Sequence, residues 1–599
     1  MAEIAGLVAA ALTDLGHDVV FPAGGLPEKG LNRVNLVVAP HEFFPLQQGV
    51  SEAHLLAAAE TCVTLGVEQP ETLWFDIGAR YSSVAQAVLD INRVAVDELN
   101  RRGIPASQLQ LGYHSTLDHW GGDPVQRSTD VVFLGSVAPR RERLLSAMAP
   151  LLWDFNLDLR LFEFPRPMTV PRGHFVAGSD KLQLLADCRI LLNIHRGEVG
   201  YFEWIRNLEA VCNGCLVLTE TSEDYGPLVP GEHLLAVPAG YLGAYAASLA
   251  SDEPLRFEIA QAAYDFVRTK LEMTSLLEPL CDEMQSAQQA PRGPRVPHAV
   301  VVEPVSVPAP RPLIADVLAS ESRIRARVKE LLDSETRLIR TVEEMQSQLT
   351  FGDSDYAETW QSEAWDDFEP ETTVIVTTYN SQGFVGRAVS SVFASSGSPI
   401  DLVVVDDHST DGTVDTLKDL MESFPAFPFR IISRAANSGV SVARNIALAA
   451  ARGRYVFVLD ADNCVYPNAI TRLADALNED AEAAFAYGII VTDPPGELIS
   501  RLAWDLPRMC ESNYVDAMAS IRRSVFDEVG GYDLHFGLVG WEDYELWLRL
   551  AAAGHRPVFI PTFIGEYSVR PGSRQDTVNL DNPALFAELR RLFDFLPWP

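Results

Sequence analysis

Three polar clusters in the second half of the chain hold the side chains best suited to chemistry. They read Thr377-Thr378-Tyr379-Asn380, Asp406-Asp407-His408-Ser409-Thr410-Asp411-Gly412 and Asp460-Ala461-Asp462-Asn463. Carboxylates that meet in one crevice repel each other unless a cation neutralises some of them. Oxygen ligands with few histidines suit Mg²⁺ or Mn²⁺. A metal that keeps open coordination positions can then bridge the two phosphates of a substrate.

The elements around these clusters explain why they should meet. From residue 371 the chain alternates apolar runs of strand length with amphipathic helical patterns. The predicted strands are 373–377, 400–405, 429–433 and 455–459, and the predicted helices are 384–394, 412–422 and one that ends at 451. This alternation favours a parallel sheet with crossover helices, and active sites of open α/β sheets lie at the carboxyl ends of the strands. Each polar cluster follows one of these strands.

Each cluster also has a plainer interpretation. The second cluster could be a turn and a helix N-cap, where Asp, Ser and Thr are favoured. Asp460 and Asp462 could be a carboxylate pair on a solvated loop. Glu542 and Asp543 could begin a surface helix, where carboxylates suit the helix dipole. The order of the three clusters, each after a strand, favours a shared site instead.

Residues 372 to about 570 resemble the family 2 glycosyltransferases, which have the GT-A fold. The resemblance is carried by Thr-Thr-Tyr-Asn at 377–380, Val-Val-Asp-Asp-His-Ser-Thr-Asp-Gly at 404–412, Asn437, Gly439, Ala443-Arg444-Asn445, Asp460-Ala461-Asp462, Gly530-Gly531-Tyr532-Asp533 and Trp541-Glu542-Asp543-Tyr544-Glu545-Leu546-Trp547. It implies transfer of a sugar from a nucleotide-sugar donor, in one displacement that inverts the anomeric configuration.

The resemblance also assigns roles by position. The donor would contact Thr377, Tyr379, Asn380, Asp406, Asp407, Arg444 and Asp460. Asp460 and Asp462 would form the family's metal-binding D-x-D motif, with Asp462 as the direct ligand of Mn²⁺ or Mg²⁺. Asp543, or alternatively Glu542, would be the general base. Trp541 would face the acceptor.

One position departs from the family pattern. Many members have a histidine near the end of the domain that completes the metal shell, whereas this chain has Arg570 in the stretch Tyr567-Ser568-Val569-Arg570-Pro571-Gly572-Ser573. An arginine cannot bind a metal ion. We therefore expect fewer protein ligands to the metal and a direct contact between Arg570 and the donor pyrophosphate. Activity without a metal is the alternative.

Residues 130–285 resemble the donor-binding half of GT-B glycosyltransferases, especially the group 1-like proteins related to the CgeB spore-maturation family. The resemblance is carried by Val132-Phe133-Leu134-Gly135-Ser136, Leu192-Asn193-Ile194-His195-Arg196, Arg206-Asn207-Leu208-Glu209-Ala210 and Asn213-Gly214-Cys215-Leu216-Val217-Leu218. It implies that Gly135 lies near the donor phosphates, that Arg206 pairs with the diphosphate and that Glu209 binds the ribose. The family's usual pair of glutamates is not intact, because only Glu203 precedes Glu209 at short range. A module that only binds acceptor or stabilises the enzyme is the alternative.

These patterns divide the chain into six segments. Residues 1–125 are predicted to be an incomplete Rossmann-like half of the GT-B module, since the chain starts inside the helix that normally follows the first strand. The donor-binding half is 126–285, and a Pro-rich linker is 286–313. Residues 314–350 are predicted to be a helix, 351–370 an acidic connector and 371–599 the GT-A domain. The helix has a heptad seam over 324–349, which fits either a homodimeric coiled coil or packing within the chain.

Composition limits the classes of molecule that the chain can bind and indicates its cellular location. The 599 residues carry a formal charge of −35, which excludes nucleic acid and anionic lipid as general partners. There is no run of 18 apolar residues, so we expect no transmembrane helix and a cytoplasmic location, with peripheral contact at the inner face of the membrane as an extension. The seven cysteines fit a reducing compartment.

The sequence thus predicts a glycosyltransferase of surface polysaccharide biosynthesis that acts on a glycan or lipid-linked acceptor. The N-terminal module would make it bifunctional, or would be a non-catalytic acceptor-binding module. A nucleotidyltransferase is a second enzymatic reading, but the Gly-rich, Lys-containing loop it needs is missing after the first strand of the C-terminal half. A glycan-binding scaffold with inactive sites is the non-enzymatic alternative.

Overall fold

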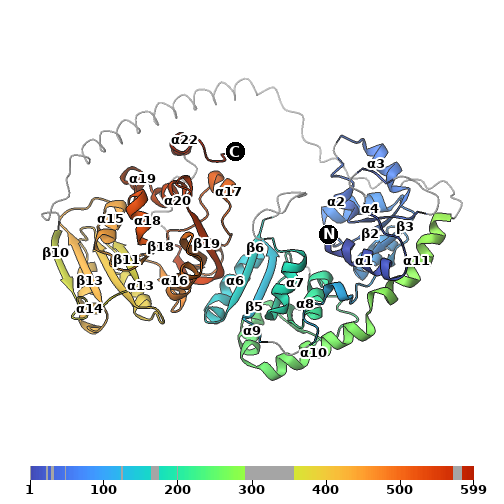
Figure 1. Ribbon diagram of the computed structural model, residues 1–599, viewed down its shortest axis with the longest axis horizontal. Coiled ribbons are helices and arrows are strands. Elements are labelled where there is room, and N and C mark those ends of the chain that lie inside the picture. Colours follow the sequence, from blue (N-terminus) through green and yellow to red (C-terminus); the bar gives the residue numbers. More distant parts are fainter. Residues whose placement is uncertain are drawn as a thin grey trace, which may run out of the picture. The chain divides into compact units, whose positions relative to one another are not determined.

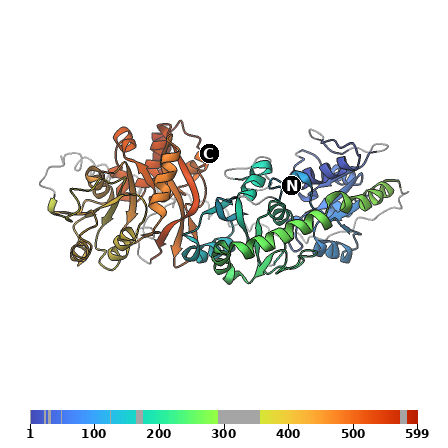
Figure 2. The same ribbon diagram turned by 60° about the horizontal axis from the view of Figure 1, so that its bottom comes forward.

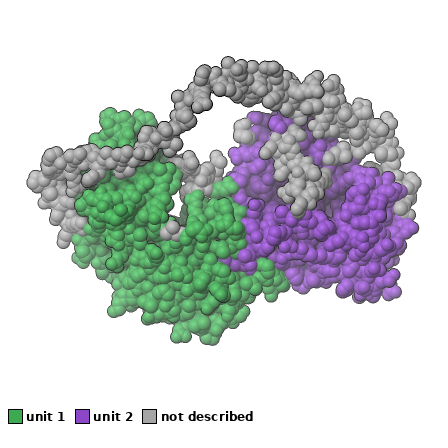
Figure 3. All heavy atoms as spheres, turned by 180° about the vertical axis from the view of Figure 1, so that it is seen from behind, with its two compact units in different colours: residues 1–144, 150–304 green, residues 145–149, 305–599 purple. Residues whose placement is uncertain are grey.

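The computed structural model describes residues 2–21, 25–27, 33–47, 49–122, 126–163, 175–198, 200–289, 356–570 and 583–598. The chain divides into two compact units (Figure 3). Unit 1 comprises residues 1–144 and 150–304, and unit 2 comprises residues 145–149 and 305–599. Both combine helices with sheets that contain parallel strands (Figure 1), which confirms the predicted α/β class.

The first sheet of unit 1 has four parallel strands in the order β1-β2-β3-β4. Its strands are β1 (Asn35–Val38), β2 (Cys62–Gly66), β3 (Ala87–Asp90) and β4 (Ser107–Gln108). The helices around them are α1 (Ala2–Asp14), α2 (Pro40–Phe43), α3 (Glu52–Ala59), α4 (Leu73–Ser82) and α5 (Arg93–Arg101), followed by the short η1 (Ser115–Leu117). β2 is buried along nearly its whole length, as a strand covered on both faces must be.

The second sheet of unit 1 has five parallel strands in the order β6-β5-β7-β8-β9. They are β5 (Thr129–Ser136), β6 (Leu157–Phe162), β7 (Cys188–Asn193), β8 (Leu216–Glu220) and β9 (Leu235–Val237). Its helices are α6 (Pro139–Leu152), α7 (Gly178–Ala186), α8 (Trp204–Cys212), the short η2 (Ala239–Tyr241) and α9 (Leu242–Ser251).

Two long helices close unit 1. α10 (Glu253–Lys270) packs on α8 and β8 of the second sheet, and α11 (Met273–Gln289) packs on α1 and β3 of the first. Figure 2 shows both in green, running one after the other along unit 1. One apolar cluster holds residues of both sheets together with Val267 and Leu277 from these helices. The two sheets of unit 1 therefore share a core.

Unit 2 is built on one mixed sheet in the order β10-β13-β12-β11-β14-β18-β16-β19-β15, with β17 beside β16. Strands β13, β12, β11 and β14 are mutually parallel, while β10 and β18 flank them antiparallel. The strands are β10 (Tyr356–Gln361), β11 (Thr372–Thr378), β12 (Ile400–Asp406), β13 (Phe429–Arg434), β14 (Tyr455–Asp460), β15 (Cys464–Val465), β16 (Ala483–Asp493), β17 (Leu498–Ile499), β18 (Ser520–Arg522) and β19 (Arg556–Ser568).

The helices of unit 2 follow the predicted crossover pattern in its first half. They are α13 (Val385–Phe393), α14 (Thr413–Ser423), α15 (Val440–Ala450), α16 (Ala469–Glu479), α17 (Leu506–Glu511), α18 (Arg523–Val529), α19 (Leu534–Val539), α20 (Glu542–Ala552) and α22 (Pro583–Leu592). The four strands predicted from residue 371 correspond to β11, β12, β13 and β14, and the three predicted helices correspond to α13, α14 and α15.

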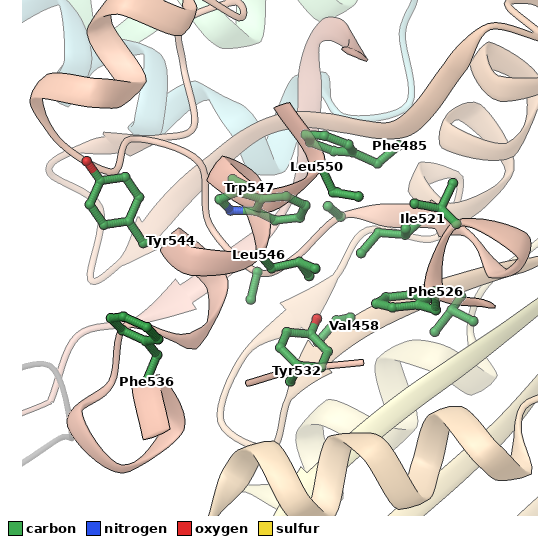
Figure 4. Packing of buried hydrophobic residues seen from close by; sticks show 14 of the residues in the cluster. Val458, Phe485, Ile521, Phe526, Tyr532, Phe536, Tyr544, Leu546, Trp547 and Leu550 are labelled. Atoms are coloured by element: carbon green, nitrogen blue, oxygen red, sulfur yellow. The ribbon is translucent and has the colours of Figure 1, made fainter. Parts of the chain in front are cut away.

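Aromatic packing fixes the position of α20, the helix that begins with Glu542 and Asp543 (Figure 4). The Trp547 ring stacks on Phe485 of β16 with a centroid distance of 4.4 Å, and its indole N–H donates to the Val515 carbonyl at 3.0 Å. Leu546 and Leu550 are buried on the same helix. A buried indole with a satisfied N–H holds one orientation, so the start of α20 is fixed relative to the sheet.

Two segments differ from the sequence prediction. Tyr356–Gln361, expected within the acidic connector, forms β10 and extends the sheet by pairing with β13. Helix α11 continues to Gln289, inside the segment predicted as linker from residue 286. The rest of the linker and the heptad helix 324–349 lie outside the described residues, so the domain boundaries and the homodimer stay predictions.

We predict that Trp547→Ala lowers the free energy of unfolding of unit 2 by about 3–5 kcal/mol, because it empties a buried aromatic site. Phe595→Ala is the control, since Phe595 is 68% exposed, and should change stability by less than about 0.5 kcal/mol. Urea unfolding followed by circular dichroism measures both. Equal midpoints for the two variants would contradict the role assigned to Trp547.

Candidate active site

The register of unit 2 brings the predicted strand ends together. Thr377 lies beside Asp460 of β14, and Thr378 lies beside Asp406 of β12. Parallel strands in register end at one edge of the sheet, so the three polar clusters share that edge as the sequence predicted. Tyr379, the next residue, is 51% exposed and leaves its ring accessible there.

Hydrogen bonds tie the loop after β11 to the loop after β12. The Asn380 amide N–H donates to Ser409 Oγ at 2.8 Å, and the Thr410 N–H donates to Asn380 Oδ1 at 2.8 Å. Asn380 adopts a positive φ of 48°, a conformation that asparagine tolerates better than most residues. The two loops therefore form one rigid rim.

Asp406 and Asp407 are both buried, and both accept hydrogen bonds that hold the loops of the rim in place. Asp407 accepts from Arg434 Nη1 at 2.9 Å and from the Gly439 N–H at 2.7 Å, at the start of α15. Asp406 Oδ2 accepts from the Ser409 N–H at 3.1 Å. Asp406 Oδ1 is buried without a hydrogen-bond partner among the described residues, so it is the acceptor that remains for a donor molecule.

Arg444 of α15 connects the sheet edge to α20. Its Nη2 lies 2.8 Å from Asp460 Oδ1, and its Nη1 lies 3.1 Å from Glu542 Oε1. The guanidinium carbon also lies 5.1 Å from the centre of the Tyr532 ring. Burial alone would lower the pKa of Arg444, but the charges of Asp460 and Glu542 raise it well above its usual value. This arginine is therefore a permanent buried cation between two carboxylates.

Asp462, the second acid of the D-x-D motif, contacts Arg570 through an ion pair. The Arg570 guanidinium carbon also lies 3.8 Å from the centre of the Phe384 ring. Burial raises the pKa of Asp462, the negative charge of Asp460 raises it further, and Arg570 lowers it. Arg570 thus lies where the resemblance places a metal-binding histidine, and it supplies positive charge to the same carboxylate.

Asp543 lies at the start of α20 with the electrostatics of a base. Burial raises its pKa to about 7, with further contributions from the charges of Glu542 and Asp516. Asn513 Nδ2 donates to Asp543 Oδ2 at 3.1 Å. Glu542 pairs with Arg444, whereas Asp543 is the candidate base whose pKa is raised toward neutral pH.

Sequence reasoning missed Asp516. Burial raises its pKa to about 6, and the nearby charge of Asp460 adds to the shift. The pKa of Tyr567 is also raised, first by burial and then by the charges of Asp516, Asp460, Asp462 and Asp543. These four carboxylates therefore share one site. Asp516 follows no recognised motif, and only the fold brings it to the others.

The structure corrects the expectation for Trp541. It was predicted to face the acceptor, but it is only 3% exposed and packs against Tyr544 and Phe586. The ring belongs to the core beneath α20.

The predicted N-terminal donor site has its charges paired within the protein. Glu209 is 1% exposed, and its Oε2 lies 2.6 Å from Lys181 Nζ. Arg206 pairs with Glu203 and donates to Asn193 Oδ1 at 3.3 Å. Gly135 of β5 faces Phe133 and Arg141, which a side chain at this position would meet. Arg206 and Glu209 lie on α8, beside the second sheet that holds Gly135, and both have protein partners.

The acidic side chains of unit 2 fit a divalent metal. Asp460 and Asp462 offer hard oxygen ligands, and the mutual repulsion that raises the pKa of Asp462 is relieved by a cation. Across the parts of the chain that the structure describes, no group of three His, Cys, Asp or Glu side chains is arranged to hold a metal. Substrate oxygens or water would have to complete the shell.

Comparison with known families places glycosyltransferase sequences in both units. Residues 373–533 match the family model of glycosyl transferase family 2, and residues 139–282 match a glycosyl transferase-like family. Both matches agree with the resemblances found in the sequence, which confirms them.

Two curated relatives resemble part of the chain. The succinoglycan biosynthesis protein ExoO of Rhizobium meliloti is 29% identical over 229 residues, which cover 36% of this chain and 65% of that protein. The putative teichuronic acid biosynthesis glycosyltransferase TuaG of Bacillus subtilis is 38% identical over 98 residues, or 16% of this chain and 37% of that protein. The chain thus spans less than two thirds of either relative. Among solved structures, residues 1–349 of S. aureus TarS align over 37% of this chain and 64% of that chain, with 19% identity and a TM-score of 0.31.

We predict that Arg444→Met destabilises unit 2 by about 3–5 kcal/mol, because it leaves Asp460 and buried Glu542 without their cation. Arg387→Met is a matched control, since Arg387 also pairs with two carboxylates, Asp493 and Glu566, but its side chain is 51% exposed. It should cost no more than about 1 kcal/mol. Hydrogen exchange of α20 peptides measures the difference, and equal protection in both variants would show that the Arg444 bridge does not hold α20.

Proposed function

We propose that this chain, whose residues 373–533 match glycosyl transferase family 2, is a glycosyltransferase of surface polysaccharide biosynthesis. Unit 2 transfers a sugar from a nucleotide-sugar donor to a glycan or lipid-linked acceptor. The observation that carries this proposal is the Arg444 bridge, which joins the D-x-D carboxylate Asp460 to Glu542 beside the base Asp543. The polysaccharide role is supported by the names of the succinoglycan and teichuronic acid relatives.

Asp543 takes the proton from the acceptor hydroxyl. With a pKa of about 7, its carboxylate is both substantially ionised and basic enough to accept that proton at neutral pH. The acceptor oxygen then forms a bond to the anomeric carbon of the donor sugar while the bond from that carbon to the diphosphate oxygen breaks. A single displacement on the face opposite the leaving group inverts the anomeric configuration.

The donor is held at the sheet edge by the residues that end β11, β12 and β14. Exposed Tyr379 offers a ring for the base, and Asp406 Oδ1 offers an acceptor for a ribose hydroxyl. Asp460 and Asp462 would hold Mn²⁺ or Mg²⁺, which supplies positive charge for the departing diphosphate. Arg570 forms an ion pair with Asp462 and can donate a hydrogen bond to a phosphate oxygen of the donor from that position.

The N-terminal module favours the acceptor-binding alternative over a second transfer. A donor diphosphate and ribose would have to displace Glu203 from Arg206 and Lys181 from buried Glu209. Breaking such pairs leaves charges without partners in a buried site, which is costly. A scaffold with inactive sites is disfavoured because Asp460, Asp462, Asp516 and Asp543 share one electrostatic site in unit 2.

No helix in the described ranges is long and apolar enough to cross a membrane. We propose a cytoplasmic location, with peripheral contact where the acceptor is lipid-linked. Dimerisation through 324–349 is part of the proposal, although that segment lies outside the described residues.

We predict that Asp462→Asn lowers the rate of donor hydrolysis at least about 100-fold, whereas Glu209→Gln keeps that rate within about threefold of the wild type. The reason is that Asp462 belongs to the reacting site of unit 2 and Glu209 to an internally paired site of unit 1. Hydrolysis of UDP-, GDP- and dTDP-sugars, with and without Mn²⁺, is the measurement. The reverse pattern, loss in Glu209→Gln alone, would move the chemistry to the N-terminal module.

The pH dependence of donor hydrolysis should follow the titration of the Asp543 carboxyl group. Because its pKa is raised to about 7, the carboxyl is protonated and inactive below that value. We expect kcat/KM for donor hydrolysis to rise with pH and level off above about pH 7. Asp543→Asn should lower the plateau at least about 100-fold and remove the rise. A wild-type profile already flat from pH 5 would exclude Asp543 as the base.

A further inference from the structure

Both acids of the D-x-D motif contact an arginine, but the two arginines are held differently. The side chain of Arg444 is only 4% exposed, and it lies between Asp460, a second carboxylate and an aromatic ring. The side chain of Arg570 is 32% exposed, and its guanidinium forms an ion pair with Asp462 and lies over the Phe384 ring. Arg570 can therefore leave its carboxylate without opening the core.

The backbone before Arg570 is fixed by hydrogen bonds that do not involve the arginine side chain. At the end of β19, the Ser568 N–H donates to Asn463 Oδ1 at 3.0 Å, and Ser568 Oγ donates to the Asp462 carbonyl at 2.5 Å. These bonds tie the end of the strand to the loop that carries the D-x-D motif. A different side chain at position 570 therefore leaves the backbone in place.

The Arg570 guanidinium and a divalent cation need the same carboxylate. Arg570 contacts Asp462 at Oδ2, and a metal ion bound to that atom would bring two positive charges into contact, which is unfavourable. Among the residues that the structure describes, no group of three His, Cys, Asp or Glu side chains could hold a metal. Few protein ligands compensate for this repulsion, so a metal ion must displace Arg570 before it binds Asp462.

A diphosphate offers Arg570 another acceptor. Guanidinium groups form strong, charge-assisted hydrogen bonds with phosphate oxygens. The Nε of Arg570 is buried without a hydrogen-bond partner among the described residues. The Phe384 ring lies 3.8 Å from the guanidinium carbon and attracts the cation through its face, without using an N–H group. The N–H groups of Arg570 are therefore available to a phosphate that arrives beside Asp462.

We propose that Arg570 competes with the divalent metal for Asp462, and that the donor diphosphate ends this competition by taking the guanidinium. The metal then binds weakly to the protein alone and more tightly beside the nucleotide. Because such coupling is reciprocal, the metal strengthens nucleotide binding by the same factor. The inference rests on the proposed function only for the identity of the diphosphate as that of the sugar donor.

Binding of Mn²⁺ to the full chain without nucleotide, measured by electron paramagnetic resonance, tests the competition. Asp462→Asn identifies the binding that belongs to this site, because a chain with a formal charge of −35 can also attract cations elsewhere. Arg570→Met removes the competing charge and should strengthen Mn²⁺ binding at this site at least about tenfold. Arg570→Lys keeps the charge and should stay within about threefold of the wild type.

Arg387→Met is the matched control for the loss of one positive charge. Arg387 pairs with Asp493 and Glu566, and its side chain is 51% exposed. Solvent and salt screen such a surface charge, so this variant should bind Mn²⁺ within about twofold of the wild type.

Titration calorimetry of UDP, GDP and dTDP, each with and without Mn²⁺, tests the coupling. For the diphosphate that binds the wild type most tightly, Mn²⁺ should strengthen binding. The ratio of the affinities with and without Mn²⁺ should fall at least about tenfold in Arg570→Met, because the competition that the diphosphate relieves is already absent. Arg387→Met should keep the wild-type ratio.

Three results would overturn the proposal. They are unchanged or weaker Mn²⁺ binding in Arg570→Met, equal strengthening in Arg387→Met, and no Mn²⁺ binding by either protein with or without a nucleotide. Hydrolysis of nucleotide sugars by the wild type, measured on the same samples, tests the proposed function separately. The expected metal affinities without any hydrolysis would support the competition and refute the transferase, whereas hydrolysis with unchanged metal affinities would do the reverse.

Discussion

A buried guanidinium between two carboxylates is the interaction on which the C-terminal site depends. Arg444 is 3% exposed and contacts Asp460 from the sheet and Glu542 from α20. In a low-dielectric interior such a cation is stable only with partners on both sides. The two partners come from elements about 80 residues apart in the chain, so the bridge fixes the position of the start of α20 relative to the end of β14.

The remaining charges of that site follow from the bridge. Arg444 and Arg570 each take up part of the negative charge at the D-x-D motif. Asp516 and Asp543 form no ion pair with an arginine or lysine among the described residues, and burial together with neighbouring acids raises their pKa values. One acidic cluster therefore contains carboxylates that pair with an arginine and carboxylates whose pKa values are raised by burial and by neighbouring acids.

The two glycosyltransferase-like modules differ in how their charges are used. In the second sheet of unit 1, Arg140 pairs with Glu220, Arg141 with Glu203 and Lys181 with Glu209. These pairs stabilise the module but leave its basic groups occupied. In unit 2, Arg444 and Arg570 pair with Asp460 and Asp462, while Asp516 and Asp543 have raised pKa values. The first sheet of unit 1 has a third arrangement, in which the buried imidazole of His41 and the buried carboxyl of Asp90, whose pKa is raised by burial, line one small cavity.

The sequence by itself determined the strands and helices from β11 to β14, both family resemblances and the residues at the strand ends. Local periodicity and motif order are enough for these, because each depends on residues close in the chain. Tertiary structure alone decided that 356–361 joins the sheet, that Trp541 is buried and that the charges of Asp460 and Asp543 act on or respond to Asp516. It also decided that Glu209 is paired with Lys181 and that His41 and Asp90 share a cavity. Such facts depend on distances across the fold and on burial, and neither the type of a residue nor its spacing along the chain specifies them.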